Sequence, residues 1–192
     1  MIRRPPRSTQ SRSSAASDVY KRQFMDGSKI PWAKKVTDLA TNQEYQHTIA
    51  MLAAAYAAKG HNVLVVSDRV SFLKTCAELA GDKAVCITGD IAQEQREELI
   101  KEVKFKDKNI LFGTQAIFSE GISIDNLSCL ILATPINNEP LLTQLIGRIV
   151  RKANNKLTPI VVDIHLKGNT AKRQALNRVG YYMKEGYEIR QL

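Results

Sequence analysis

The sequence predicts an α/β protein built on an open parallel sheet of at least five strands, with helices on both faces. Three observations support this fold class. Short apolar runs rich in β-branched residues recur along the chain from residue 62 onward. Segments with a helical period separate these runs. Polar or glycine residues follow most of the runs directly, as expected where helical crossovers join parallel strands.

Five apolar runs are predicted strands. They are too short for buried helices, and their flanks hold glycine, asparagine, serine or proline. In chain order they are 62–67, 84–88, 109–113, 128–133 and 159–164.

Three predicted helices alternate with the first strands. The first ends at Gly60, and its inward residues are Ile49, Leu52, Ala53 and Tyr56. The second ends near Gly81, and its inward residues are Phe72, Leu73, Cys76 and Leu79. The third is highly charged, with Glu97 and Lys101 at the i,i+4 spacing of an exposed pair. Its inward residues are Leu99, Ile100 and Val103.

Two further helices are predicted near the C-terminal end. One begins at Pro140, because proline suits the first turn of a helix. Its expected buried side consists of Leu141, Leu142, Leu145, Ile146, Ile149 and Val150. The other spans about 171–184, with Leu176, Val179 and Met183 predicted inward and Lys172, Arg173 and Arg178 on its other faces.

The first 23 residues differ in kind from the rest. They are rich in serine, arginine and proline, and they carry six basic residues against one acidic residue. This leaves about +4 of the net charge of +9 for the remainder, which is weak evidence for an anionic partner. The stretch is similar to a translated sequencing-adaptor artefact, so we expect 1–23 to be disordered and non-native. The alternative is a basic arm that binds nucleic acid.

Domain organisation follows from this division. We expect 24–41 to be a linker or remnant of a preceding region, and 42–192 to form one domain. The chain has no apolar run near the ~20 residues that span a bilayer, so we expect a soluble protein with no membrane partner. The expected location is the cytoplasm, or the host cytoplasm for a viral protein.

Metal chemistry is not indicated. Cys76, Cys86 and Cys129 lie far apart inside apolar stretches, as is typical of core residues in a reducing compartment. The three histidines show no ligand spacing. We therefore predict no metal ligands in this chain.

Polar residues follow four predicted strands at their carboxyl ends. They are Ser67-Asp68-Arg69, Thr88-Gly89-Asp90, Gly113-Thr114 and Thr134-Pro135. Each alone is most simply a helix cap. Because the carboxyl ends of parallel strands meet at one edge, the four together predict a long polar rim suited to an extended ligand.

The helix that begins at Pro140 carries a second polar group. Gln144, Arg148 and Arg151 stand at i, i+4 and i+7, opposite the apolar side, and Gly147 keeps the surface low between them. Arginine suits a phosphate because its planar guanidinium stays charged and can bind two oxygens at once. The alternative is an ordinary solvated helix face.

These residues resemble the C-terminal lobe of superfamily 2 helicases. Residues 144–151 (QLIGRIVR) resemble motif VI, QxxGRxxR. Residues 114–124 are similar to motif V, and 63–73 to motif IV with its following helix. The tail from Arg173 to Leu192 resembles that of bacteriophage helicases of the UvsW type. The resemblance implies a RecA-like fold, as in P-loop NTPases, over nearly all of the chain from about Val36 onward.

The resemblance also implies roles for individual residues. Arg148 and Arg151 would be arginine fingers that stabilise charge on the γ-phosphate of ATP, with Gln144 at the same phosphate. Gly121 and Ser123 would lie near the nucleotide, although many relatives have aspartate at position 123. The sugar-phosphate backbone of the nucleic acid, DNA more than RNA, would be held by Ser67, Arg69, Gly89 and Thr114.

Two parts of the helicase engine are missing from the sequence. It contains neither a GxxxxGK[ST] motif nor the acidic motif that holds magnesium. In the family both belong to a first RecA-like lobe, so we expect that lobe as a partner within one protein and expect this chain alone to be inactive. Two alternatives stay open: the motor lobe of a restriction or remodelling translocase, and an inert nucleic-acid-binding module.

Overall fold

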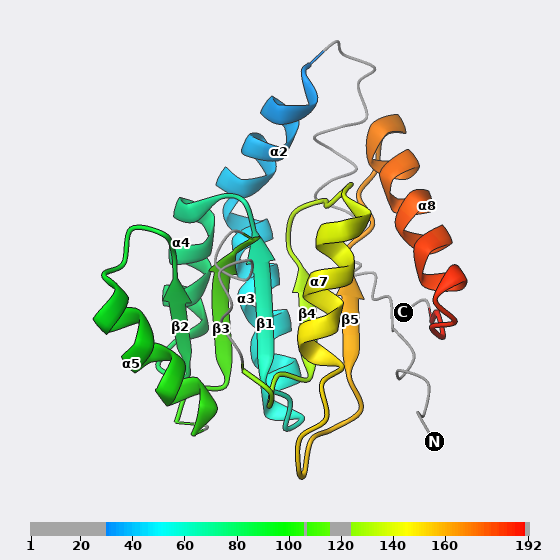
Figure 1. Ribbon diagram of the computed structural model, residues 1–192. Coiled ribbons are helices and arrows are strands. Elements are labelled where there is room, and N and C mark those ends of the chain that lie inside the picture. The colour runs from blue at the N-terminus through cyan, green and yellow to red at the C-terminus, as the bar shows by residue number, and fades with distance from the viewer. Residues whose placement is uncertain (1–29, 106, 116–123, 191–192) are drawn as a thin grey trace.

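The computed structural model describes residues 30–105, 107–115 and 124–190, and in these ranges it has a five-stranded sheet in the order β2-β3-β1-β4-β5 (Figure 1). All four neighbouring pairs are parallel, as predicted. The strands are β1 (Val63–Ser67), β2 (Ala84–Ile87), β3 (Ile110–Thr114), β4 (Cys129–Leu132) and β5 (Ile160–Asp163). Each falls within about one residue of a predicted strand.

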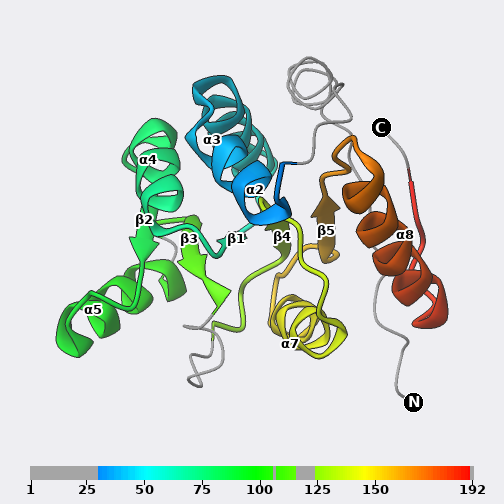
Figure 2. The same cartoon turned by 90° about the horizontal axis from the view of Figure 1, so that it is seen from above.

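Helices cover both faces of the sheet (Figure 2). The described helices are α2 (Trp32–Thr41), α3 (Gln43–Ala58), α4 (Val70–Ala80), α5 (Gln93–Lys104), α7 (Glu139–Ile149) and α8 (Asn169–Lys184). Helices α2, α3 and α4 pack on one face, whereas α5 and α7 pack on the other. Helix α8 lies beside the edge strand β5 and contributes to both cores.

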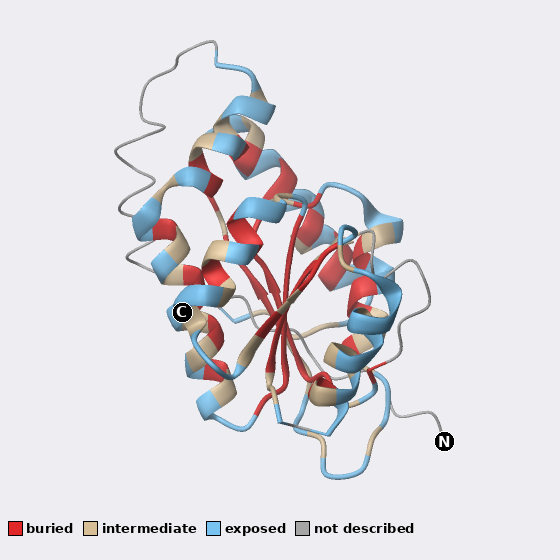
Figure 3. Cartoon of the chain, turned by 90° about the vertical axis from the view of Figure 1, so that its left-hand side faces the viewer, coloured by how far each residue is buried: buried red, intermediate tan, exposed pale blue. Residues whose placement is uncertain are grey.

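The two cores are separated by the alternation of side chains along each strand. In β1, Val63 and Val65 point into the core under α3 and α4, whereas Leu64 and Val66 point into the core under α7. Because both faces are covered, the strands are apolar at nearly every position. Figure 3 shows the result as a buried sheet surrounded by helices with exposed outer faces.

Part of the stretch expected to be a linker or a remnant of a preceding region is helical. Helix α2 occupies the second half of 24–41, and Leu39 is fully buried in the core with α3. The sequence contains the pattern of this helix, because Val36, Leu39 and Ala40 stand at helical spacing. All three are buried in the structure. The expectations for 1–23 and for the first part of the linker lie outside the described residues.

Helix α8 corrects a second prediction, because its inward face was assigned wrongly. Leu176 and Met183 are 60% and 67% exposed, and Val179 is only partly buried. The buried face instead consists of Ala171, Gln174, Ala175, Arg178, Tyr181 and Tyr182. Arg178 faces inward because the carboxylate of Asp163, buried at the end of β5, requires a charged partner.

Smaller differences concern how deeply predicted core residues of the other helices are buried. Leu79 in α4 is 41% exposed, and the last turn of that helix packs on the core through Ala77 and Ala80 instead. Four other predicted core residues are only partly buried at the margin of the core under α7, namely Leu99, Ile100, Leu141 and Val150. The helix ends predicted at Gly60 and Gly81 are confirmed, and both glycines have the positive φ that favours glycine.

Candidate functional site

The predicted site residues lie at two opposite edges of the sheet. The polar residues that follow β1, β2 and β3 lie at the carboxyl edge, where Ser67 is the register partner of Thr114. Helix α7 starts beyond the carboxyl end of β4 and runs back along the sheet (Figure 1). Arg151, two residues beyond the end of α7, contacts Asp125, which precedes β4, so Arg148 and Arg151 lie toward the amino edge.

The register of α7 determines which of its side chains face outward. Asn138 caps the helix by accepting a hydrogen bond from the backbone N–H of Leu141 at 3.0 Å, and a proline follows in the first turn. The apolar side packs into the core with Leu142, Leu145, Ile146 and Ile149. Gln144 is therefore exposed and Arg148 is half-buried.

The two arginines are close enough to interact electrostatically. Partial burial lowers the pKa of Arg148, and the positive charge of Arg151 lowers it further. Arg151 lies two residues beyond α7, and its Nη1 is 3.4 Å from Oδ1 of Asp125. Two guanidiniums held together in this way, one of them well exposed, are suited to an anion with several oxygens.

Lys156 joins this group and was not predicted from the sequence. Its Nζ donates hydrogen bonds to the backbone carbonyls of Asp125 at 2.9 Å and Arg151 at 2.6 Å. Burial lowers the pKa of the Lys156 ammonium to about 8; Asp125 opposes this shift and Arg151 adds to it. No helicase motif quoted above includes position 156, so only the fold reveals this contact.

The surface at Gly147 is open, because a Cβ atom added there would meet no other heavy atom within 4 Å. This agrees with the predicted low surface between Gln144 and the arginines. The other two predicted nucleotide residues, Gly121 and Ser123, lie outside the described residues.

At the carboxyl edge, Ser67 does not have the predicted exposure. It is fully buried, and its Oγ accepts hydrogen bonds from the backbone N–H of Arg69 and from Oγ1 of Thr134, both at 3.1 Å. A serine in this position holds the β1–α4 turn and cannot itself meet a ligand. Arg69 is partly exposed, with Nε 3.6 Å from Oδ1 of Asp68.

The remaining rim residues are accessible. Thr114 is half-buried at the end of β3, and Gly89 is exposed with open space where a side chain would stand. An ion pair links the turn that contains Gly89 to α4: Nζ of Lys74 in α4 lies 2.7 Å from Oδ2 of Asp90. Hydrogen bonds from Lys74 and then from Thr88 lower the pKa of Asp90 to about 2. Gly89, Thr114 and Arg69 thus lie at the carboxyl ends of three adjacent strands, along one edge of the sheet.

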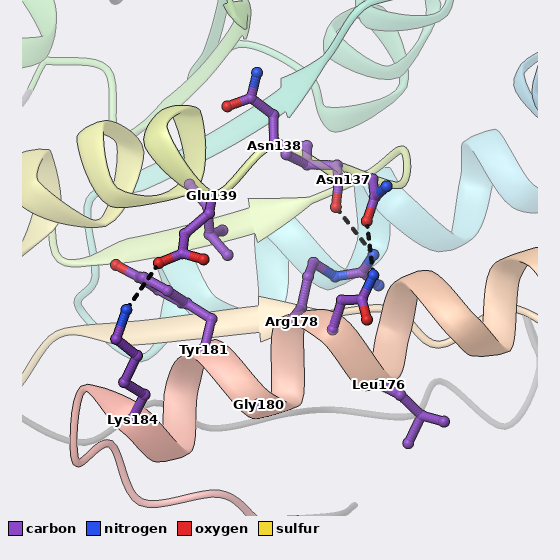
Figure 4. Close-up of a pocket in the computed structure, with 11 residues that line it drawn as sticks. Asn137, Asn138, Glu139, Leu176, Arg178, Gly180, Tyr181 and Lys184 are labelled. Atoms are coloured by element: carbon purple, nitrogen blue, oxygen red, sulfur yellow. Dashed lines mark hydrogen bonds and ion pairs between the residues drawn. The ribbon is translucent and has the colours of Figure 1, made fainter.

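A pocket of about 570 Å³ lies between the start of α7 and the C-terminal half of α8 (Figure 4). Asn137, Asn138 and Tyr181 contribute to its wall, together with Arg178. None of the predicted site residues lines it.

Within the described ranges, no group of three or more histidine, cysteine, aspartate or glutamate side chains could hold a metal ion. The cysteines are free thiols, with Cys76 and Cys129 buried and Cys86 partly buried. Burial raises the pKa of Cys76 to about 12 and that of Cys86 to about 11, so both are protonated at neutral pH. Among the same residues, no helix is long and apolar enough to cross a membrane.

Comparison with known protein families matches residues 44–153 to the helicase conserved C-terminal domain. The probable helicase D10 of Escherichia phage T5 is 40% identical over 162 residues, which cover 83% of this chain and 36% of that protein. The ATP-dependent DNA helicase uvsW of Enterobacteria phage T4 is 28% identical over 166 residues, covering 81% of this chain and 32% of that protein.

Solved structures show the same fold. The crystal structure of T4 UvsW superposes with a TM-score of 0.75 at 22% identity, covering 96% of this chain and 41% of that one. The L327V variant of Dbp5 from Saccharomyces cerevisiae, bound to RNA and ADP BeF3, gives a TM-score of 0.65 at 12% identity, covering 97% of this chain and 41% of that one. The chain spans about a third of the length of the curated relatives it matches.

Proposed function

The chain belongs to the family of helicase conserved C-terminal domains, and from this we propose that it is the second RecA-like lobe of an ATP-dependent superfamily 2 DNA helicase. In this proposal a first lobe holds ATP and magnesium. The present lobe brings two arginines to the nucleotide at one edge and contacts nucleic acid at the other.

The arrangement of Arg148 and Arg151 is the observation that carries the proposal. Arg148 lies in the last turn of a helix that is fixed by its buried apolar side, Arg151 lies two residues beyond that helix, and the two guanidiniums are within electrostatic reach of each other. In the transition state negative charge is spread over the transferring γ-phosphoryl group and develops on the leaving oxygen, and preorganised guanidiniums stabilise that charge. Such residues are worth on the order of 10³–10⁵ in rate.

Three more residues are assigned to the nucleotide. Gln144 is exposed on the same face of α7, one turn before Arg148, where its amide can orient a phosphate or the attacking water. Gly121 and Ser123 are proposed to lie near the nucleotide, as their place in motif V implies. A serine hydroxyl at 123 can bond a ribose or a phosphate, but it adds no charge there.

The carboxyl edge is the proposed nucleic-acid track. Arg69, Gly89 and Thr114 would contact the sugar-phosphate backbone, which is bound without regard to base sequence. We propose that Ser67 positions Arg69 and does not contact the nucleic acid itself, because its buried hydroxyl accepts a hydrogen bond from the backbone N–H of Arg69. The relatives include both kinds of helicase: uvsW of phage T4 is named a DNA helicase and L396 of Acanthamoeba polyphaga mimivirus a putative RNA helicase, each 28% identical to this chain. We propose DNA, as for uvsW, and the backbone contacts proposed here are open to either nucleic acid.

Replacing the arginines tests this function. In the complete enzyme, with this lobe joined to its own first lobe, Arg151→Ala and Arg148→Ala should each lower kcat for nucleic-acid-stimulated ATP hydrolysis by about 10³-fold or more. The matched control is Lys152→Ala, which removes one exposed positive charge from the neighbouring position and should leave kcat within about twofold. Full activity in both arginine variants would refute the proposal.

A further inference from the structure

Arg151 lies beyond the C-terminal end of α7, so the helix does not fix its backbone. The helix ends at Ile149 with Val150 as its C-cap, so the backbone of Arg151 already belongs to the loop that leads to β5. An arginine that must meet a phosphate within a few tenths of an ångström needs its backbone held in place. The position of Arg151 must therefore be set by contacts other than the helix.

Lys156 supplies such contacts from the other side of the loop. The loop turns back at Asn155, which adopts a positive φ of 59°, a conformation that asparagine tolerates better than most residues. This turn returns the Lys156 side chain to the end of α7. There its Nζ donates to the carbonyl oxygen of Arg151 at 2.6 Å and to that of Asp125 at 2.9 Å.

The three residues close a ring of contacts. The carboxylate of Asp125 meets the guanidinium of Arg151 at 3.4 Å, and the ammonium of Lys156 meets the backbone carbonyls of both. Asp125 lies two residues after Ser123, so the ring joins the segment that follows motif V to the last arginine of motif VI. A displacement of any one of the three residues would strain the other two.

We propose that Lys156 is a positioning residue for ATP hydrolysis, which sets the place of the Arg151 guanidinium by tying the backbone at Arg151 to the backbone at Asp125. This inference rests on the proposed function, because it concerns the same arginine. Lys156 is not assigned to the nucleotide, because its Nζ donates to two backbone carbonyl oxygens and its side chain is partly buried. The burial that lowers the pKa of its ammonium to about 8 agrees with this inward position.

The test compares Lys156→Met, Lys156→Arg, Arg151→Ala and the double variant Arg151→Ala/Lys156→Met in the complete enzyme. We expect Lys156→Met to lower kcat by about 10- to 100-fold, as a misplaced catalytic group does, with KM for ATP within about twofold. Lys156→Arg, which keeps charged donors, should recover most of the activity. The double variant should be no slower than Arg151→Ala alone, because Lys156 acts through Arg151.

A second measurement uses the present chain without the first lobe. The NMR signal of the Arg151 Nε–Hε group should shift or broaden in Lys156→Met and stay in place in Lys152→Met, which removes a neighbouring exposed lysine. An unmoved signal in Lys156→Met would overturn the inference even if that variant were too unstable for kinetics.

The outcomes separate the two proposals. If Arg148→Ala and Arg151→Ala both keep full activity, the proposed function itself fails. If Arg151→Ala alone keeps it, the role of Lys156 fails together with that of Arg151. If Arg151→Ala is slow but Lys156→Met is not, or if the two losses multiply in the double variant, only the role of Lys156 fails. A rise in KM with unchanged kcat in Lys156→Met would also overturn it, because that result would mean direct contact with the nucleotide.

Discussion

At the scale of single residues, Asp163 and Arg178 form an ion pair in which both side chains are almost fully buried. The guanidinium donates to both carboxylate oxygens, through Nε and Nη2, at 2.8 Å, and Tyr182 donates a third bond at 3.0 Å. Burial alone would raise the pKa of Asp163, but His165 and Arg178 more than offset it and lower the pKa to about 2. The pair also holds the loop after β4, because Nη1 of Arg178 donates to the carbonyl of Ile136 at 3.2 Å.

Breaking this pair from one side should be costly. Arg178→Met leaves the Asp163 carboxylate buried without its cation, so we expect the free energy of unfolding to fall by about 3–5 kcal/mol in urea titrations. The double variant Asp163→Leu/Arg178→Met removes both charges and should recover a large part of that loss. A loss below about 1 kcal/mol in Arg178→Met would show that the pair does not hold α8.

At the scale of elements, α8 illustrates how a polar contact can decide which face of a helix is buried. Its sequence contains two candidate faces, one apolar with Leu176 and Met183 and one mixed with Arg178, Tyr181 and Tyr182. The mixed face is buried because it brings the cation to Asp163 and adds two tyrosine rings to the core. Helix α7 offers no such choice, since its single apolar side matches the sheet.

The two faces of α8 should respond differently to the same substitution. Leu176→Gln and Met183→Gln change exposed positions, and we expect each to alter the free energy of unfolding by less than about 0.5 kcal/mol. Ala175→Gln, on the buried face of the same helix, should destabilise by about 1–3 kcal/mol through overpacking. Urea titrations of the three variants check this, and the reverse order would mean that the predicted inward face is the correct one.

At the scale of the whole molecule, the sheet separates two kinds of contact. The arginine pair lies toward the amino edge and the polar rim at the carboxyl edge, so the strands and α7 connect them mechanically. The chain supplies only one side of the proposed nucleotide site, because its sequence has no GxxxxGK[ST] motif to cradle the phosphates.

The lack of a phosphate-binding motif in the sequence predicts that the 192-residue chain does not hydrolyse ATP by itself. Phosphate release from ATP and magnesium, with or without DNA, should equal that of a blank without protein. Arginines without a phosphate-binding loop have no held nucleotide to act on. Hydrolysis above the blank that disappears in Arg151→Ala would contradict the prediction and place a complete site within this chain.

The sequence by itself determined the strands, most helices and the residues of motif VI. Each depends on a local period: apolar runs for strands, and spacings of three and four residues for α7. Only the tertiary structure decided that the arginines and the polar rim lie at opposite edges, that Ser67 is buried, that Arg178 faces inward and that Lys156 reaches Asp125. The reason is physical, because these features depend on contacts between residues distant in the chain, and a local pattern carries no information about which distant group a side chain will meet.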